Sequence, residues 1–186
     1  PLDIAMETRH RLSEIYHEQL DYQRFFDELN EMVEEDRNAG PDRTDRSRFL
    51  GARAALRLVE RDYEAFARLE LKQPFEQSLA VKQKSMDTTL AALENLVSYE
   101  VAEVTAAATF YIAEVYMNFI VSLIDSERPE GLTAQEQVSY VMVIEEVAYP
   151  FEVQAITVHE ENFELLAAGV YNPWVQKSLD SLADLM

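Results

Sequence analysis

Apolar residues recur along most of this chain at the spacing of one face of an α-helix. Between residues 3 and 18 they include Ile4, Leu12 and Ile15, a spacing closer to a period of 3.6 residues than to strand alternation. A second helix is predicted from about Tyr22 to Asp36, with acids opposite its apolar stripe. That stripe consists of Phe25, Phe26, Leu29, Met32 and Val33.

Turn-forming residues separate the next predicted helices. Residues 37–45 hold Gly40, Pro41 and short polar side chains, which indicates a loop. Thr44 or Asp45 is expected to cap a helix that runs to about residue 71, and Pro74 should break or restart it. Helical runs then follow from about 75 to 97 and from 100 to 124. The pattern leaves open whether Ser98-Tyr99 is a bend or a continuous join.

The last third of the chain contains clear start and stop patterns. Residues 125–133 form a second loop, and Thr133 with Glu136 three positions on is typical of a capping box. The helix that starts there is predicted to break at Pro150, resume from residue 151 and end at Gly169. A final helix is expected from Trp174 to residue 185.

These elements predict an all-α fold of seven or eight helices with no convincing strand. Antiparallel helix hairpins stacked side by side, as in an α-solenoid fragment with some long helices, account for the short loops. Four Gly and six Pro are few for 186 residues, which disfavours a fold rich in tight hairpin turns. We expect a first helix pair in residues 1–40, packed with long-helix hairpins in 44–186 as one continuous helical domain.

The charge balance excludes some partners. Sixteen Lys and Arg stand against 35 Asp and Glu, a net charge of −19, which repels nucleic acid and anionic lipid. The acids either keep an extended helical surface soluble or match a basic partner. The absence of cysteine excludes disulfides and cysteine-ligated metals and leaves the compartment open.

Residues 106–124 are apolar enough to suggest a membrane-spanning helix, because Glu114 is the only charged residue among them. A central carboxylate and the lack of flanking basic clusters favour a buried helix instead. Glu114 must then find a donor or lie at an exposed edge, and burial would raise its pKa. Because the chain begins with Pro1 and no leader pattern, we expect a piece of a longer protein whose targeting signal lies outside it.

Two E-x-x-H patterns, Glu7–His10 and Glu14–His17, raise the question of a metal site. In di-iron bundles the two copies come from facing helices, whereas here both lie on one helix. No phosphate loop, G-x-S-x-G or H-E-x-x-H pattern is present. We therefore expect no catalytic residues, cofactor or metal. The alternative is a carboxylate and histidine metal-binding bundle, such as a ferritin-like oxidase or store.

The first helix pair resembles a tetratricopeptide repeat, a helix-turn-helix unit of about 34 residues. Leu12, Ser13 and Tyr16 fall on first-helix positions, and Asp21-Tyr22 falls on the turn. The second-helix positions hold Phe25, Leu29 and Met32. The sequence departs from the pattern at Phe25, where a small Ala is usual, and at Arg37, where Pro is common.

The remainder, roughly 69–186, resembles the C-terminal region of large tetratricopeptide-containing proteins of Gram-negative cell envelopes. The similar strings are QPFEQSL (73–79), EVTAAATFYIAEVYMNF (103–119), DSERPEGL (125–132), YPFEVQAITVHEENF (149–163) and YNPWVQKSL (171–179). Such proteins are often encoded with TonB/ExbB/ExbD-type energy-transduction components. The resemblance implies a non-enzymatic adapter in the periplasm or envelope that binds other proteins, with those components as candidate partners. The oligomeric state stays open.

Two groups of residues are candidates for protein binding. First helices line the ligand face of tetratricopeptide arrays, which points to Arg9, Ser13, Tyr16 and His17. The second group gathers aromatic side chains beside two prolines, and Tyr and Trp are favoured interface anchors; the alternative is that they pack the last hairpin. This group is Tyr149, Phe151, Tyr171 and Trp174. A structural spacer without a ligand is a third interpretation.

Overall fold

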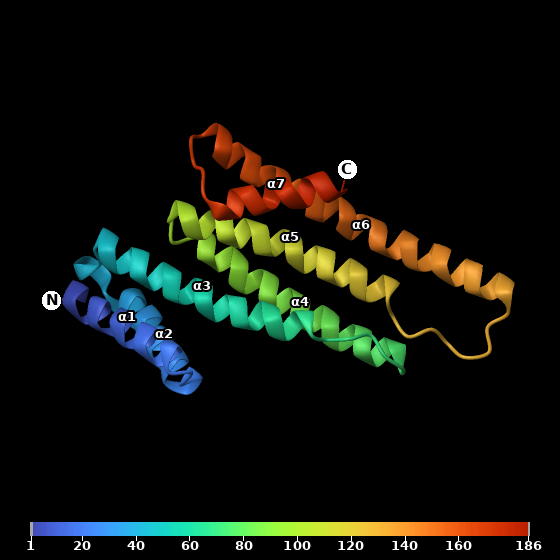
Figure 1. Ribbon diagram of the computed structural model, residues 1–186, viewed down its shortest axis with the longest axis horizontal. Helices are drawn as coiled ribbons and strands as arrows, with labels where there is room; N and C mark the ends of the chain where they lie inside the picture. Colours follow the sequence, from blue (N-terminus) through green and yellow to red (C-terminus); the bar gives the residue numbers. More distant parts are fainter. Residues whose placement is uncertain (1, 186) are drawn as a thin grey trace.

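The computed structural model describes residues 2–185, which form seven α-helices and one short 3-10 helix and contain no strand (Figure 1). The prediction of an all-α fold is confirmed. The α-helices are α1 (Leu2–Glu18), α2 (Tyr22–Asn38), α3 (Asp45–Ala67), α4 (Phe75–Val97), α5 (Ala102–Ile124), α6 (Ala134–Ala167) and α7 (Pro173–Leu185), and the 3-10 helix is Gly40–Asp42.

Threonine side chains begin two of the long helices, as the sequence predicts. Thr133 Oγ1 accepts the backbone N–H of Glu136 at 3.3 Å, and Glu136 Oε2 accepts the Thr133 N–H at 2.8 Å. Thr44 and Ser47 exchange the same pair of bonds at the start of α3, both at 3.0 Å. Each of these two capping boxes provides acceptors for two backbone N–H groups that have no partner inside the helix.

The predicted end of α6 at Gly169 is also confirmed. Gly169 has a φ of +85°, and its N–H donates to the Leu166 carbonyl at 2.9 Å. The next N–H, of Val170, donates to the Leu165 carbonyl at 2.9 Å. These two bonds close the last turn, and the left-handed conformation that they need is open to glycine at little cost.

Ser98-Tyr99 belongs to a break between α4 and α5, which the sequence left open. Glu100 has a φ of +55°, so the chain reverses through a left-handed residue. The second run therefore begins at Ala102, two residues after the predicted start.

The predicted break at Pro150 is wrong, because α6 continues through it as one helix of 34 residues. Inside a helix, proline removes one N–H from the hydrogen-bond ladder and its ring crowds the carbonyl four residues earlier. Packing of both halves of α6 on α5 holds the helix axis across that gap. Ile144 and Ala148 are buried before the proline, and Ala155 and His159 are buried after it.

The chain folds back on itself helix by helix (Figure 1). The hairpin of α1 and α2 packs on α3, and α4 lies beside α3 and α5. Helix α5 is central to the remaining part, since it contacts α3, α4, α6 and α7. The first half of α6 runs along the opposite end of the molecule from α1 and α2.

Helix α3 joins two apolar clusters. Its Leu50 and Ala54 bury against Met6 of α1 and Leu29 of α2. Other positions on α3, such as Leu56, belong to the larger core made with α4, α5 and α6. Burial of each large aliphatic side chain stabilises the fold by about 1.5–3 kcal/mol. Helix α3 therefore packs against the α1–α2 hairpin on one side and against the long helices on the other.

Helix α5 has the length and hydropathy of a membrane-crossing helix. Ala106, Ala107, Ala108 and Ala113 on α5 are fully buried, and such small side chains allow neighbouring helices to approach closely. An apolar helix of this kind also suits the centre of a helical bundle.

Candidate functional site

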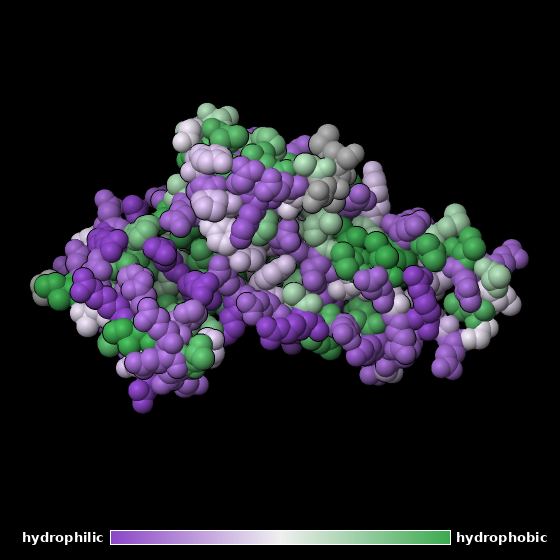
Figure 2. All heavy atoms as spheres, viewed as in Figure 1, coloured by the Kyte–Doolittle hydropathy of each residue, from purple (hydrophilic) through white to green (hydrophobic). Residues whose placement is uncertain are grey.

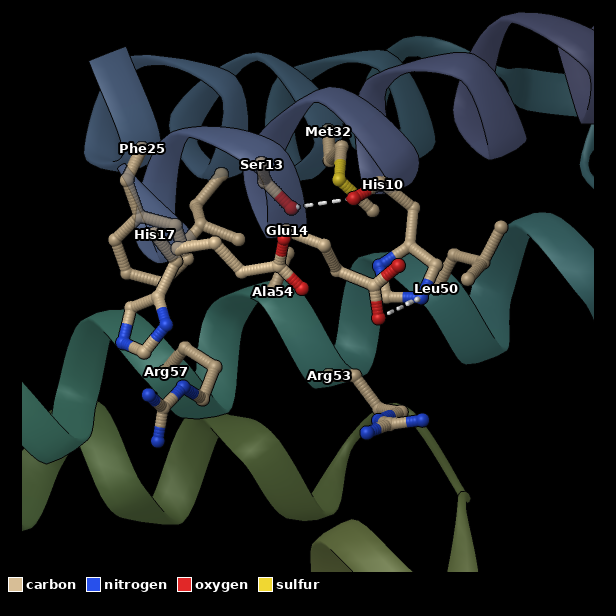
Figure 3. Close-up of a pocket in the computed structure, with 12 residues that line it drawn as sticks. His10, Ser13, Glu14, His17, Phe25, Met32, Leu50, Arg53, Ala54 and Arg57 are labelled. Carbon is tan, nitrogen blue, oxygen red and sulfur yellow. Dashed lines mark hydrogen bonds and ion pairs between the residues drawn. The ribbon is translucent and has the colours of Figure 1, made fainter. Parts of the chain in front are cut away.

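A groove of about 390 Å³ lies between α1 and α3, with α2 contributing to its floor (Figure 3). Apolar side chains form the floor because the three helices meet there around the N-terminal cluster. Polar side chains on α1 and α3 form the two walls. The floor consists of Phe25, Leu29, Met32, Leu50 and Ala54, and the walls hold His10, Ser13, Glu14, His17, Glu18, Arg53 and Arg57.

The two walls carry opposite charges. Glu14 and Glu18 lie on the α1 wall, and Arg53 and Arg57 lie one turn apart on the α3 wall. Arg57 Nη1 donates to Glu60 Oε2 at 2.6 Å. The Arg53 guanidinium lies 5.6 Å from the ring centre of Phe49 and forms no ion pair with the carboxylates of residues 2–185. Its N–H donors are therefore available to a ligand.

Neighbouring side chains orient the two histidines of the α1 wall. His10 Nε2 lies 3.6 Å from Glu14 Oε1, one turn along the same helix. The His17 ring packs against Phe25, with ring centres 5.0 Å apart, and against Tyr22 at 6.1 Å. In Figure 3 both histidines project from α1 toward α3.

Of the four residues predicted on α1, Ser13 and His17 line this groove. Ser13 is buried, and its Oγ donates to the His10 carbonyl at 2.7 Å. Tyr16 packs at the edge of the N-terminal cluster, and the Arg24 guanidinium lies 5.5 Å from its ring centre. Sequence reasoning missed Arg53 and Arg57, although their i, i+4 spacing on a predicted helix places them on one face.

Arg9, the fourth of those residues, faces α2 instead. Its guanidinium donates to Glu35 Oε1 at 2.7 Å and to Glu28 Oε2 at 2.9 Å, and Glu31 lies 3.5 Å away. The hydrogen bond to Glu35 is the largest of the causes that raise the pKa of Arg9. Arg9 therefore ties α1 to α2.

The E-x-x-H residues of α1 do not converge on one point. Glu7 Oε1 accepts from Arg46 of α3 at 2.6 Å, while His10 faces Glu14. Within residues 2–185, no three His, Asp or Glu side chains are arranged to hold a metal ion.

The four aromatic residues predicted near the C-terminus occupy different environments. Phe151 packs edge-to-face on Phe119 of α5, with ring centres 4.8 Å apart. Trp174 packs on Tyr111 at 5.3 Å. Tyr149 and Tyr171 are exposed. The 18 residues of α6 that follow Tyr149 rise by about 27 Å along the helix, and Tyr171 lies in the loop after its end.

A buried polar cluster joins α5, α6 and α7. Ser181 Oγ donates to Glu114 Oε1 at 3.3 Å, and His159 Nε2 lies 3.8 Å from the same oxygen. Burial raises the pKa of Glu114 and lowers that of His159. Asn162 Nδ2 donates to Ser178 Oγ at 2.7 Å.

No partner for Glu114 could be predicted from the sequence, because its contacts come from distant helices. The pattern that marks this cluster is a pair of polar residues three apart on each of two amphipathic helices: His159 with Asn162 on α6, and Ser178 with Ser181 on α7. His159, Asn162 and Ser178 are fully buried, and none of the three lines the α1–α3 groove. It fastens α7 to α5 and α6.

Lys82 is a second buried polar group that sequence reasoning missed. Its Nζ donates to the Leu69 carbonyl at 2.8 Å and to Asn118 Oδ1 at 2.8 Å, and it lies 4.5 Å from the ring centre of Phe66. Burial lowers its pKa to about 8. The last carbonyls of a helix lack partners inside it. The Lys82 amine, on α4, occupies this position at the C-terminal end of α3 and links it to α5.

Comparison of the chain with protein-family models, with curated proteins and with solved structures gave no match.

Proposed function

We propose that this chain is a non-enzymatic adapter that binds a peptide segment of a partner protein in the groove between α1 and α3. The observation that carries the proposal is an apolar floor between two walls of opposite charge. An apolar side chain of the partner fills the floor, and charged groups on either side of it meet the walls. Such an arrangement fixes both the position and the direction of a bound segment.

Arg53 and Arg57 are the strongest recognition groups of the groove. Two guanidinium groups one turn apart offer N–H donors in a planar array that suits carboxylates. Arg53 has no carboxylate to satisfy it within residues 2–185. A partner segment with an acidic side chain next to an apolar anchor meets both needs.

The cellular setting is proposed from the resemblance to tetratricopeptide-containing envelope proteins. That resemblance supports a periplasmic or envelope-associated adapter whose partners are other proteins, with energy-transduction components as candidates. No membrane-spanning role and no chemical reaction is assigned to the chain in this proposal.

Selection of displayed random peptides on the purified chain tests the groove. Peptides that carry an acidic residue beside a large apolar residue are expected to be enriched. The double variant Arg53→Glu/Arg57→Glu should weaken their binding by about tenfold or more, because it replaces attraction by repulsion. Both side chains are exposed, so helix content should stay unchanged.

A matched control, Arg61→Glu/Arg68→Glu, changes two other exposed arginines, one in α3 and one directly after its end, and neither lines the groove. Binding of the selected peptides to this variant should stay within about twofold of wild type. Equal losses in both variants would show a general charge effect and contradict the groove. Stoichiometric iron or manganese in the purified protein would instead favour the metal-binding alternative.

A further inference from the structure

The first half of α6 exposes an apolar stripe at the end of the molecule opposite the groove. Val138, Met142 and Tyr149 are each more than 60% exposed, and Val153 is 44% exposed. Figure 2 shows apolar atoms along the part of the surface that α6 occupies in Figure 1. The inward side of the same helix packs Ile144 and Ala148 on α5.

The spacing of these four residues makes the stripe continuous. They stand at positions i, i+4, i+11 and i+15, which lie within one narrow sector of a helix with 3.6 residues per turn. From Val138 to Val153 the helix rises by about 22 Å. This is the length over which a second helix of four turns packs along its neighbour.

The α6 segment that carries the stripe is acidic, and Arg128, whose guanidinium lies 5.2 Å from the ring centre of Tyr140, stands at its N-terminal end. Between Arg128 and Lys177 the sequence has eight glutamates and no Lys, Arg or Asp. Glu145 and Glu152 follow Val138 at i+7 and i+14, so they run along one edge of the stripe. All eight glutamates are exposed, and none is in an ion pair within the described chain. The eight are Glu130, Glu136, Glu145, Glu146, Glu152, Glu160, Glu161 and Glu164.

The charge at this end differs from that at the groove end. Residues 1–68 hold 11 of the 16 basic residues, and many of their acids are in ion pairs, such as Asp36 with Arg43 and Glu60 with Arg57. Residues 69–186 hold five Lys or Arg against 19 Asp or Glu, a net charge of −14. The negative potential is therefore concentrated on the half that carries the stripe.

This combination selects one kind of occupant. A second copy of the chain seated on the same stripe would bring unpaired glutamates of both copies together, and like charges across an interface oppose association. Anionic lipid and nucleic acid meet the same repulsion. A cationic segment gains from the charges, and its apolar side chains cover the valines, Met142 and Tyr149.

We infer that the exposed face of α6 from Val138 to Val153 is a docking surface for a basic amphipathic helix of a partner protein. The apolar side of the partner helix lies along the stripe, and its Lys or Arg side chains reach the glutamates at the edges. The apolar contact supplies most of the affinity, and the charges set orientation and speed of association. This surface is separate from the α1–α3 groove, so the chain carries two binding surfaces at opposite ends.

A pair of synthetic helical peptides tests the surface directly. Both peptides have the same leucine stripe, and one carries Lys at every polar position where the other carries Glu. In fluorescence anisotropy the Lys peptide is expected to bind at least about tenfold more tightly than the Glu peptide, with affinity falling as salt rises. Equal binding of the two peptides would contradict the proposal.

Substitutions in the chain distinguish binding at this surface from nonspecific binding to exposed apolar side chains. The triple variant Val138→Ser/Met142→Ser/Tyr149→Ser should weaken binding of the Lys peptide by about tenfold or more. The matched control, Ile4→Ser/Leu20→Ser/Val81→Ser, removes three equally exposed apolar side chains elsewhere and should stay within about twofold of wild type. Unchanged binding in the α6 variant, or equal loss in both, would overturn the assignment.

Two further measurements distinguish other occupants. Sedimentation that shows wild-type dimers lost in the α6 variant would assign the stripe to a second copy and overturn the proposal. Binding to phosphatidylcholine vesicles that is lost in the same variant would assign it to lipid, with the same consequence. Because Arg53→Glu/Arg57→Glu should leave Lys-peptide binding unchanged, failure here and failure of the groove are independent.

Discussion

Gly51 of α3 lies directly against the side chain of Asp36 of α2. A Cβ placed on Gly51 would stand 2.7 Å from the Asp36 Cβ, closer than side-chain carbons pack. The Asp36 carboxylate is buried, and it accepts from Arg43 Nε at 2.9 Å and from Arg43 Nη2 at 2.7 Å. Glycine at this point thus lets α2 and α3 approach closely enough to bury the Asp36 carboxylate beside Arg43.

Gly51→Ala is expected to lower the free energy of unfolding by about 1–3 kcal/mol, because the added methyl pushes the helices apart. The better helix propensity of alanine, about 1 kcal/mol, offsets only part of this cost. Urea denaturation followed by circular dichroism measures the change. Arg61→Ala, at an exposed position of the same helix, serves as the control and should fall within about 0.5 kcal/mol of wild type. A stabilised Gly51→Ala variant would show that the helices are not in close contact there.

Arg9→Ala should destabilise the α1–α2 hairpin by about 2 kcal/mol, because it removes two charge-assisted hydrogen bonds and leaves Glu28 and Glu35 beside each other. Thermal and urea unfolding measure this loss, which added salt should reduce by screening the two carboxylates. Arg37→Ala removes an exposed pair with Glu34 on one helix and should cost no more than about 0.5 kcal/mol. Similar losses in both variants would argue against a special role for Arg9.

Lys82 should make stability depend on pH above neutrality. Its pKa in the folded chain is about 8, against an ordinary value of 10.5. Between these pH values the unfolded chain holds a proton on Lys82 that the folded chain has lost. The contribution of Lys82 to the free energy of unfolding therefore increases as pH rises. Lys82→Met should remove that gain in urea titrations across the window. Exposed Lys84→Met on the same helix should retain it, and a flat wild-type profile relative to Lys82→Met would contradict the burial.

Glu114 should make the free energy of unfolding depend on pH in the opposite direction, at lower pH. Burial raises its pKa above the ordinary 4.5, so above pH 4.5 the folded chain holds a proton that the unfolded chain has lost. Stability from this group is therefore lost as pH rises through the raised pKa. Glu114→Gln keeps the acceptor for Ser181 and should be more stable than wild type at neutral pH, with the difference shrinking toward pH 4.5. Exposed Glu146→Gln should show no such trend.

Local features of the fold could be predicted because they depend on residues within about one helical turn. The boxes at Thr44 and Thr133 and the end at Gly169 involve only neighbouring N–H, carbonyl and side-chain groups. The break at Pro150 was predicted by the same local reasoning and is wrong. Contacts of α6 with α5 on both sides of the proline outweigh the lost hydrogen bond and the crowding of the proline ring.

Only part of the candidate site could be found from the sequence. Ser13 and His17 were found because a helical repeat places first-helix residues on one face. Arg9 has the same kind of position, yet it faces α2, where it bonds Glu28 and Glu35 across the hairpin. Periodicity fixes which residues share a face and says nothing about what that face meets.

The sequence by itself determined the helices, most of their ends and the acidic character of the chain, because these follow from composition and short-range hydrogen bonding. Tertiary structure alone decided which apolar faces are covered and which charges meet. Ser181 reaches Glu114 across 67 residues of chain, and the α1–α3 walls are brought together by the packing of α2. Such contacts depend on how whole helices cross, and that arrangement is set by the collective packing of side chains distant in the sequence.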